Sequence, residues 1–117
     1  PKDADSRYQL GLACNEAGDL DSARKELQQA TQLNPRHAAA WYNLGLAQNS
    51  LGQPDAAIES LLRGESAEPR DARIPYARAT ILARLGQTKT AILAARRALE
   101  INPAFVEARQ LLQQLGE

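Results

Sequence analysis

A period of 34 residues runs through the chain and restricts its fold more than any other feature of the sequence. Residues of four types recur at this spacing, and a fixed period of roughly 20–50 residues is the signature of a repeat architecture. The sets are Pro35, Pro69 and Pro103; Gly18, Gly52 and Gly86; Ala23, Ala57 and Ala91; and Tyr8, Tyr42 and Tyr76. We predict three repeat units, 4–37, 38–71 and 72–105, followed by a short tail.

Each unit is predicted to contain two helices joined by a tight turn. In the middle unit Trp41, Leu44, Leu46 and Leu51 fall on one helical stripe. Gly52 then ends this helix, as glycine does where a left-handed backbone is needed. Pro54 fits the first turn of the second helix, because its missing N–H is no loss there. Pro69 prevents that helix from continuing.

The other two units are expected to turn in the same way, with capping side chains at the start of the second helix. In the first unit the turn is Gly-Asp-Leu-Asp, where Asp19 or Asp21 can cap, and in the third it is Gly-Gln-Thr-Lys, where we expect Thr88 to cap. Pro75 disfavours a helical conformation at the preceding residue. The fifth helix is therefore predicted to begin near Ile74 or Pro75 rather than at Ala72.

Small residues also recur at fixed places in the units, and we expect them to let the helices approach closely as ridges settle into grooves. We interpret them as packing positions without chemistry. The sets are Gly11, Gly45 and Ala79; Ala23, Ala57 and Ala91; and Ala30, Gly64 and Ala98.

The order W-x2-L-G, Ala, a bulky residue and Pro, repeated every 34 residues, resembles the tetratricopeptide repeat. The middle unit matches at Trp41, Leu44, Gly45, Ala57, Leu61 and Pro69, and the first at Leu10, Gly11, Ala23, Leu27, Ala30 and Pro35. The third departs from the pattern with Pro75 for Trp, Arg78 for Leu and Ala95 for the bulky residue. The resemblance implies an all-α, right-handed α-solenoid of three helix pairs, forming a single domain over 1–117.

The tail is predicted to form a capping helix over 105–116 that covers the open end of the third unit. Val106, Leu111, Leu112 and Leu115 supply its apolar side. Gln110, Gln113 and Gln114 give it the polar outer side that a terminal unit needs for solubility. The alternative is that the tail begins a fourth repeat.

The resemblance also implies that the first helix of each pair lines a concave groove. Tyrosine joins a rigid apolar ring to a polar tip, and asparagine can pair with the backbone of an extended peptide. The alternative is that the tyrosines only pack between neighbouring first helices. The predicted peptide-binding residues are Tyr8, Leu12, Asn15, Tyr42, Asn43, Leu46, Asn49, Arg73, Tyr76, Thr80 and Arg84.

One known ligand class of the family can be compared residue by residue. Chaperone-adaptor tetratricopeptide domains hold the C-terminal carboxylate of heat-shock chaperones with a set of polar side chains. Asn43 matches this set, and Arg73 stands where the family has lysine. Tyr8, Leu12 and Ala77 occupy the remaining positions and cannot replace the polar residues found there. The resemblance therefore argues against that ligand.

The formal net charge is zero, with 14 basic and 14 acidic residues, which argues against a general polyanion binder. The charge is nevertheless uneven, because unit 72–105 holds six basic residues and the single acid Glu100. This excess would steer an acidic partner to the third unit or favour a head-to-tail self-contact. The alternative is a solvated face without a role. Nucleic acid is not expected, because aromatic and basic residues are not interleaved.

No pattern for catalysis or for cofactor or metal binding is found. The chain has one cysteine, Cys14, and one histidine, His37, and it lacks a glycine-rich phosphate loop and a nucleophile elbow. We predict a protein that is not an enzyme, with no catalytic residue, cofactor or metal. Cys14 is expected to be a small core residue and His37 a solvated turn residue. No apolar run approaches the ~20 residues of a membrane helix, so no membrane insertion is expected.

The function most consistent with these observations is a protein–protein interaction scaffold that binds a peptide segment or helix in the groove, as a monomer or with weak self-association. The alternative is a structural, self-assembling or docking unit of a larger protein. The chain has no Met and opens at Pro1, which we interpret as a piece of a longer protein. Its 11 arginines against 3 lysines favour a bacterial origin. The compartment is not indicated.

Overall fold

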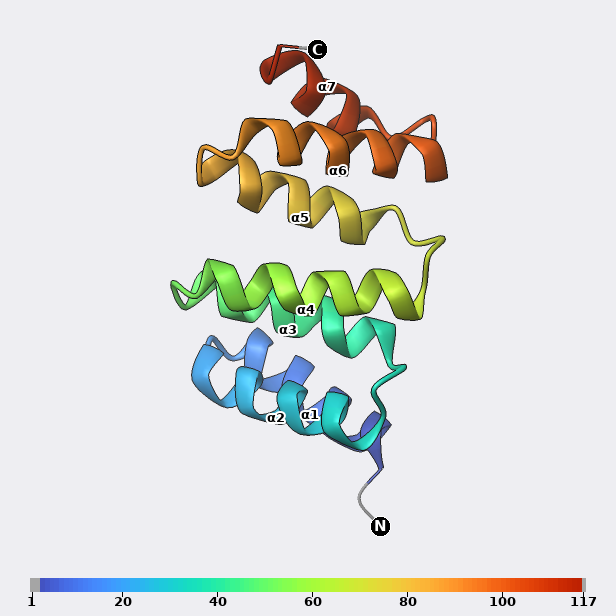
Figure 1. Cartoon of the computed structure of the whole chain (residues 1–117). Helices are drawn as coiled ribbons and strands as arrows, with labels where there is room; N and C mark the ends of the chain where they lie inside the picture. Colours follow the sequence, from blue (N-terminus) through green and yellow to red (C-terminus); the bar gives the residue numbers. More distant parts are fainter. Residues whose placement is uncertain (1–2, 117) are drawn as a thin grey trace.

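The computed structural model describes residues 3–116, which form seven α-helices and no strand. Figure 1 shows these helices stacked in chain order from the N-terminal to the C-terminal end. The expected all-α solenoid is confirmed. The helices are α1 (Ala4–Glu16), α2 (Leu20–Leu33), α3 (Ala38–Ser50), α4 (Pro54–Ala67), α5 (Arg73–Arg84), α6 (Thr88–Ile101) and α7 (Val106–Gln114).

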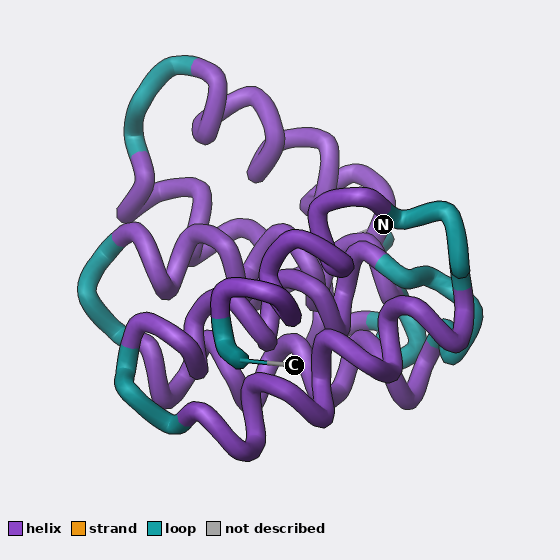
Figure 2. The backbone as a smooth tube through the Cα atoms, turned by 90° about the horizontal axis from the view of Figure 1, so that it is seen from above, coloured by secondary structure: helices purple, strands orange, loops and turns teal. Residues whose placement is uncertain are grey.

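The helices pack as three antiparallel pairs, α1 with α2, α3 with α4 and α5 with α6, followed by the single helix α7. Each pair contacts the next through its second helix, so α2 meets α3, α4 meets α5 and α6 meets α7. The first helices also touch one another in series. Seen from above, successive pairs do not lie directly over one another (Figure 2). The result is an elongated stack of 48 × 26 × 20 Å.

The turn within each pair depends on a glycine with a left-handed backbone, as predicted. Gly18, Gly52 and Gly86 have φ angles of 83°, 79° and 79°. The next amide then bonds back to a carbonyl of the preceding helix, as from Gln53 to Gln48 at 2.9 Å. This closure satisfies carbonyls that the helix end would otherwise leave unpaired.

The starts of the second helices agree only in part with the predictions made from the sequence. Asp19 caps α2 by accepting from the Ser22 N–H at 3.1 Å, and Pro54 is the first residue of α4. The prediction for Thr88 is wrong, because Thr88 is already the first helical residue and Gln87 precedes it without a side-chain cap.

Helix α5 begins at Arg73, one residue before the predicted start. The carboxylate of Asp71 accepts the Arg73 N–H at 3.1 Å, and the Asp71 carbonyl accepts the Ile74 N–H at 3.2 Å. Pro75 therefore lies in the first turn of the helix, where an N–H has no intrahelical partner and its absence costs nothing.

Pro75 occupies the position that Trp41 has in the middle pair. In the third pair, a different side chain therefore makes the hydrogen bond that Trp41 makes in the middle pair. The Trp41 Nε1–H donates to the Pro35 carbonyl at 2.7 Å. In the following pair, Arg97 donates to the equivalent carbonyl of Pro69 at 3.2 Å. The loop before each first helix is thus anchored in both pairs, by side chains from different helices.

Small residues lie where the two helices of a pair come closest, which confirms their interpretation as packing positions. A Cβ added at Gly11 would lie 2.7 Å from Leu27, and one added at Gly45 would lie 2.9 Å from Leu61. In the third pair, alanine replaces both the glycine and the leucine: Ala79 and Ala95 are fully buried. In the third pair, the larger Ala79 in place of glycine is therefore matched by the smaller Ala95 in place of leucine.

Helix α7 covers the end of the third pair, but over a shorter range than predicted. Leu112 is buried against this pair, with Leu111 and Leu115 packed beside it. Val106, which was expected on the covering side, is instead exposed. The glutamines at 110, 113 and 114 are exposed, as expected. Within residues 3–116, no helix is long and apolar enough to cross a membrane.

Candidate peptide-binding face

The three tyrosines lie on α1, α3 and α5, and each contacts a residue at the start of the following first helix. The ring of Tyr8 lies 4.7 Å from that of His37, before α3. The guanidinium of Arg73, the first residue of α5, lies 4.7 Å from the centre of the Tyr42 ring. These contacts connect each pair to the next. All three tyrosines are half-buried.

At the third position the contact is between two aromatic rings. Tyr76 lies 4.9 Å from Phe105, which precedes α7. The tyrosines therefore pack between neighbouring first helices, as the alternative interpretation expected. Each tyrosine is only half-buried as a residue, so packing does not remove it from the surface.

His37 is not the solvated turn residue that the sequence suggested. It caps α3, where its Nδ1 accepts the Ala40 N–H at 3.1 Å. Its Nε2 therefore carries the proton and donates to the carboxylate of Asp5 at 3.0 Å. The cap and the Tyr8 ring together hold the imidazole half-buried.

Arg73 is held over Tyr42 by a bidentate ion pair. Its Nε and Nη2 donate to the two carboxylate oxygens of Asp71 at 3.0 and 2.7 Å. The Arg73 hydrogen bonds hold the pKa of Asp71 below its usual value, although burial opposes this effect. The pKa of Arg73 is raised, chiefly by Asp71, with smaller electrostatic contributions from Tyr42 and Tyr8. The guanidinium of Arg73 thus links the start of α5 to the Tyr42 ring of the preceding pair.

The other predicted residues lie on the same three helices as the tyrosines. The Asn43 amide donates to the Ala39 carbonyl at 2.9 Å, and the Thr80 hydroxyl donates to the Ala77 carbonyl at 2.7 Å, each within its own helix. Leu12 and Asn49 are half-buried, whereas Asn15, Leu46 and Arg84 are exposed. We call the eleven predicted residues together the tyrosine face.

Sequence reasoning missed the residues that contact Tyr8 and Tyr76 and the carboxylate that holds Arg73 over Tyr42. His37, Asp71 and Phe105 were not included in the predicted site, although they follow the tyrosines at a constant interval and share the 34-residue register. Their different chemistry hid the relationship, because an imidazole, a carboxylate that holds a guanidinium, and a phenyl ring do not form an obvious set. Cys14 was predicted in the core but is only half-buried.

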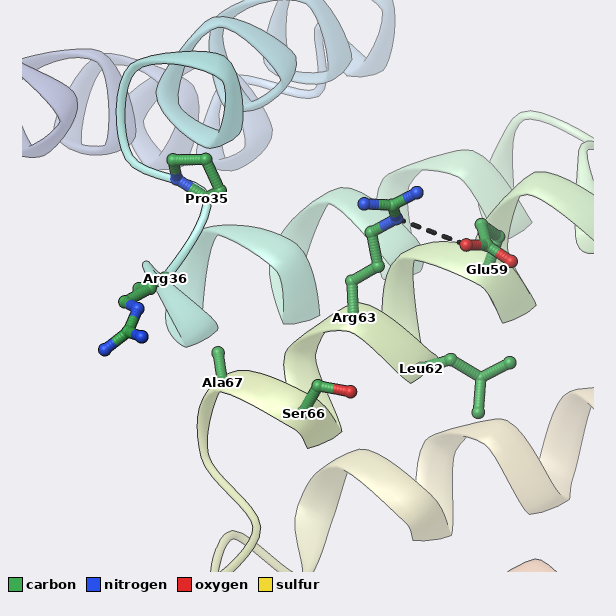
Figure 3. Close-up of a pocket in the computed structure, with 7 residues that line it drawn as sticks. All are labelled: Pro35, Arg36, Glu59, Leu62, Arg63, Ser66 and Ala67. Carbon is green, nitrogen blue, oxygen red and sulfur yellow. Dashed lines mark hydrogen bonds and ion pairs between the residues drawn. The ribbon is translucent and has the colours of Figure 1, made fainter.

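Two hollows lie on the surface near these elements. One, of about 550 Å³, is lined by Asp71, Arg73 and Phe105 together with residues of the α6–α7 loop, and so adjoins the tyrosine face. The other, of about 580 Å³, lies between the α2–α3 loop and α4. Figure 3 shows Arg63 in this second hollow turned toward Glu59. Residues 3–116 contain no cluster of three histidine, cysteine or acidic side chains that could hold a metal ion.

Comparisons with known proteins agree with this architecture. The sequence profile described as tetratricopeptide repeat matches residues 8–65 and 50–106. No curated protein sequence matches the chain significantly. Among solved structures, MamA is similar with a TM-score of 0.92 and 25% identity over 96% of this chain, which spans 66% of the MamA chain.

Two further similar structures contain bound peptides. The type III secretion chaperone SycD of Yersinia enterocolitica, in complex with a peptide of the translocator YopD, matches with a TM-score of 0.90 and 21% identity over 95% of this chain and 90% of SycD. The first tetratricopeptide domain of Spaghetti (RPAP3), bound to an HSP90 peptide, matches with a TM-score of 0.90 and 18% identity over 96% of this chain and 89% of that domain. With the profile match over most of its length and this stack of helix pairs, the chain belongs to the tetratricopeptide repeat family.

Proposed function

We propose that this chain is a protein-interaction scaffold that binds a peptide segment or a helix of a partner along the tyrosine face. The observation on which the proposal rests is the series of contacts at Tyr8, Tyr42 and Tyr76, which runs through all three helix pairs. We further propose that the pairs are three repeats, 4–37, 38–71 and 72–105, of one domain capped by α7.

The accessible groups of the face suit an extended peptide. The side chains of Asn15 and Asn49 make no hydrogen bond within residues 3–116, so their amide groups are available to a peptide backbone. Leu46, which is 37% exposed, offers an apolar contact on the same face. The neighbouring hollow beside Arg73 and Phe105 has room for a partner side chain.

The bound peptides in the SycD and RPAP3 structures support peptide binding by this fold. The HSP90-type carboxylate clamp is not proposed for this chain. Tyr8, Leu12 and Ala77 stand at its polar positions, and Ala77 is buried. The Asn43 amide group already donates to a carbonyl of its own helix.

An acidic partner is favoured near the third pair. Most of the arginines there have carboxylate partners, such as Arg78 with Glu65 and Arg97 with Glu100. Arg84 and Lys89, on either side of the α5–α6 turn, are exposed and have no ion pair among the described residues. These two cations would attract a carboxylate-rich segment to that end of the tyrosine face.

The proposal can be tested without knowing the natural partner. Peptides selected from a random phage-displayed library on the wild-type chain would be measured against the double variant Tyr42→Ala, Asn49→Ala, with circular dichroism to confirm that it folds. Because the double variant lacks the Tyr42 ring and the Asn49 amide, we expect it to bind the selected peptides at least about tenfold more weakly than the wild-type chain does. Leu93→Asp, on the exposed side of α6, is the matched control and should bind as wild type does. Unchanged affinity of the double variant would refute this assignment.

A structural or self-assembling role in a larger bacterial protein is the second candidate. The opposite charges of the middle and third pairs favour it, since residues 38–71 hold five acids against Arg63 and Arg70. Sedimentation over a concentration series separates the two functions: a mass that rises with concentration and falls with added salt supports self-assembly. A constant monomer mass excludes self-assembly.

A further inference from the structure

The hollow of about 580 Å³ between the α2–α3 loop and α4 is open because of the side chain that anchors the loop. In the middle pair, Trp41 reaches the Pro35 carbonyl from the first helix, α3. In the third pair, Arg97 reaches the equivalent carbonyl, that of Pro69, from the second helix, α6, and so crosses the gap between helix and loop. Arg63, the residue of α4 that corresponds to Arg97, bonds within α4 instead, so the gap stays open in the middle pair.

One loop residue and four residues of α4 determine the chemistry of this space, which we call the α4 hollow. They are Arg36 of the loop and Glu59, Leu62, Arg63 and Ser66 of α4 (Figure 3). All five are exposed, and none of them belongs to the tyrosine face. Leu62, which is 41% exposed, provides an apolar surface among the polar groups. Such an open hollow suits a segment of another protein better than a small molecule, because small-ligand sites enclose most of their ligand.

The α4 hollow carries positively charged hydrogen-bond donors that are not in use. Arg36 has no ion pair among residues 3–116, and only its backbone N–H is bonded, to Asn34. Arg63 donates to Glu59 through Nε at 3.2 Å, and its two Nη groups make no hydrogen bond with a described residue. The side chains of Arg63 and Glu59 are 59% and 63% exposed, and such an exposed pair contributes little. Two guanidinium groups therefore share a single weakly held carboxylate.

We propose that the α4 hollow binds an acidic peptide segment of a partner protein, in which glutamate or aspartate residues lie beside an apolar one. The carboxylates would bond to Arg36 and to the Nη groups of Arg63, and the apolar side chain would pack on Leu62. The Ser66 hydroxyl, which makes no hydrogen bond within residues 3–116, would pair with the peptide backbone. Because the tyrosine face contributes no residue, this inference is independent of the proposed function.

Trp41 provides a reporter for this site. It is the only tryptophan of the chain, and the Arg63 guanidinium lies 5.6 Å from the centre of its ring. A carboxylate that draws Arg63 toward the peptide changes the surroundings of the indole, so a bound peptide should alter Trp41 fluorescence. Arg84 and Lys89 lie at the α5–α6 turn, on the opposite edge of the stack from the α2–α3 loop (Figure 1). An acidic peptide bound there should leave the Trp41 signal unchanged.

The probe is the end-blocked peptide Glu-Glu-Leu-Glu-Glu, titrated into the chain at low ionic strength while Trp41 fluorescence is followed. The comparison peptide Gln-Gln-Leu-Gln-Gln has the same length and the same apolar residue without the charge, and it should cause no change. Arg36→Gln should weaken binding of the acidic peptide about three- to fivefold, because one ion pair is lost. The matched control Lys25→Gln, which removes a charge at an exposed position on α2, should bind as wild type does. Circular dichroism checks that each variant is folded.

Glu59→Gln is the sharpest test, because the proposal predicts tighter binding. Removing the carboxylate that competes for Arg63 should strengthen binding about three- to fivefold. Asp55→Asn makes the same charge change one turn earlier on α4 and should have a much smaller effect. The proposal is overturned if the acidic peptide leaves Trp41 fluorescence unchanged, if these two variants bind equally, or if free glutamate at the same concentration gives the same signal. A dimer in sedimentation that Arg36→Gln dissociates would assign the hollow to a second copy of the chain and would also overturn it.

Discussion

Gly45→Ala tests how closely the two helices of a pair must approach. The added Cβ would lie 2.9 and 3.0 Å from Cγ and Cδ2 of Leu61 and 3.2 Å from the backbone oxygen of Ala57. Both neighbours are fully buried. Neither can move away without disturbing the surrounding core, so α3 and α4 must separate slightly.

The size of the effect follows from two opposing contributions. Overpacking of this kind costs about 1–3 kcal/mol. Alanine in place of glycine within a helix returns about 1 kcal/mol. We expect a net loss of about 1 kcal/mol in the free energy of unfolding, which corresponds to a fall of about 4 °C in Tm for a domain of this size.

Urea unfolding followed by circular dichroism measures this loss, and a double-mutant cycle with Leu61→Ala isolates its cause. The third pair already combines Ala79 with Ala95 at the equivalent positions. In the Leu61→Ala background the two contacts with Leu61 are absent and only the one with the Ala57 oxygen remains, so Gly45→Ala should instead stabilise by up to about 1 kcal/mol, a coupling of at most about 2 kcal/mol. Equal effects of Gly45→Ala in both backgrounds would refute the close-approach argument.

Three further predictions concern stability. Leu44→Ala should lower the free energy of unfolding by about 2–5 kcal/mol, because it leaves a cavity in the core. Leu10→Ala, at the equivalent exposed position, should change it by less than about 0.5 kcal/mol. Thermal melts of the two variants measure the difference. Ser60→Ala should cost about 1–3 kcal/mol in urea unfolding, because Gln48 Oε1, which now accepts from the Ser60 hydroxyl at 2.6 Å, would be left buried and unpaired. The pKa of Asp71 in the folded protein is lowered from its ordinary value of 3.8. Its ion pair therefore stabilises the fold fully above pH 3.8, and this stabilisation is lost as the pH falls through the pKa of the folded state. Asp71→Asn should therefore lower the free energy of unfolding at pH 7. The difference from wild type should become smaller when urea unfolding is repeated at pH values below about 4, and a difference that does not change with pH would contradict this assignment.

Local features of the fold could be predicted because they depend on residues close together in the chain. Gly18, Gly52 and Gly86 adopt positive φ as expected, since only glycine does so without strain. Asp19 caps its helix through a hydrogen bond to an amide three residues away. Thr88 failed as a cap because capping requires a residue just outside the helix, and helix ends are sensitive to shifts of one residue.

Contacts between pairs could not be predicted in the same way. The sequence places Tyr8 and Tyr42 on equivalent helix positions, yet one lies against an imidazole and the other under a guanidinium. These partners come from the following pair, and no local pattern indicates which side chain will reach the ring. The tyrosine face as a binding site stays a prediction, to be tested by the experiments above.

The 34-residue period, its glycines and its small residues by themselves determine that the chain forms stacked helix pairs, because each of these signals acts within one unit or at a fixed step. Only the tertiary structure decides which equivalent residues are covered. Leu10 and Leu44 occupy the same place in the repeat, but one is exposed and the other buried. The physical reason is that burial depends on what packs from outside the unit, and α2 packs on α3 whereas no helix of this chain packs on the outer side of α1 within residues 3–116.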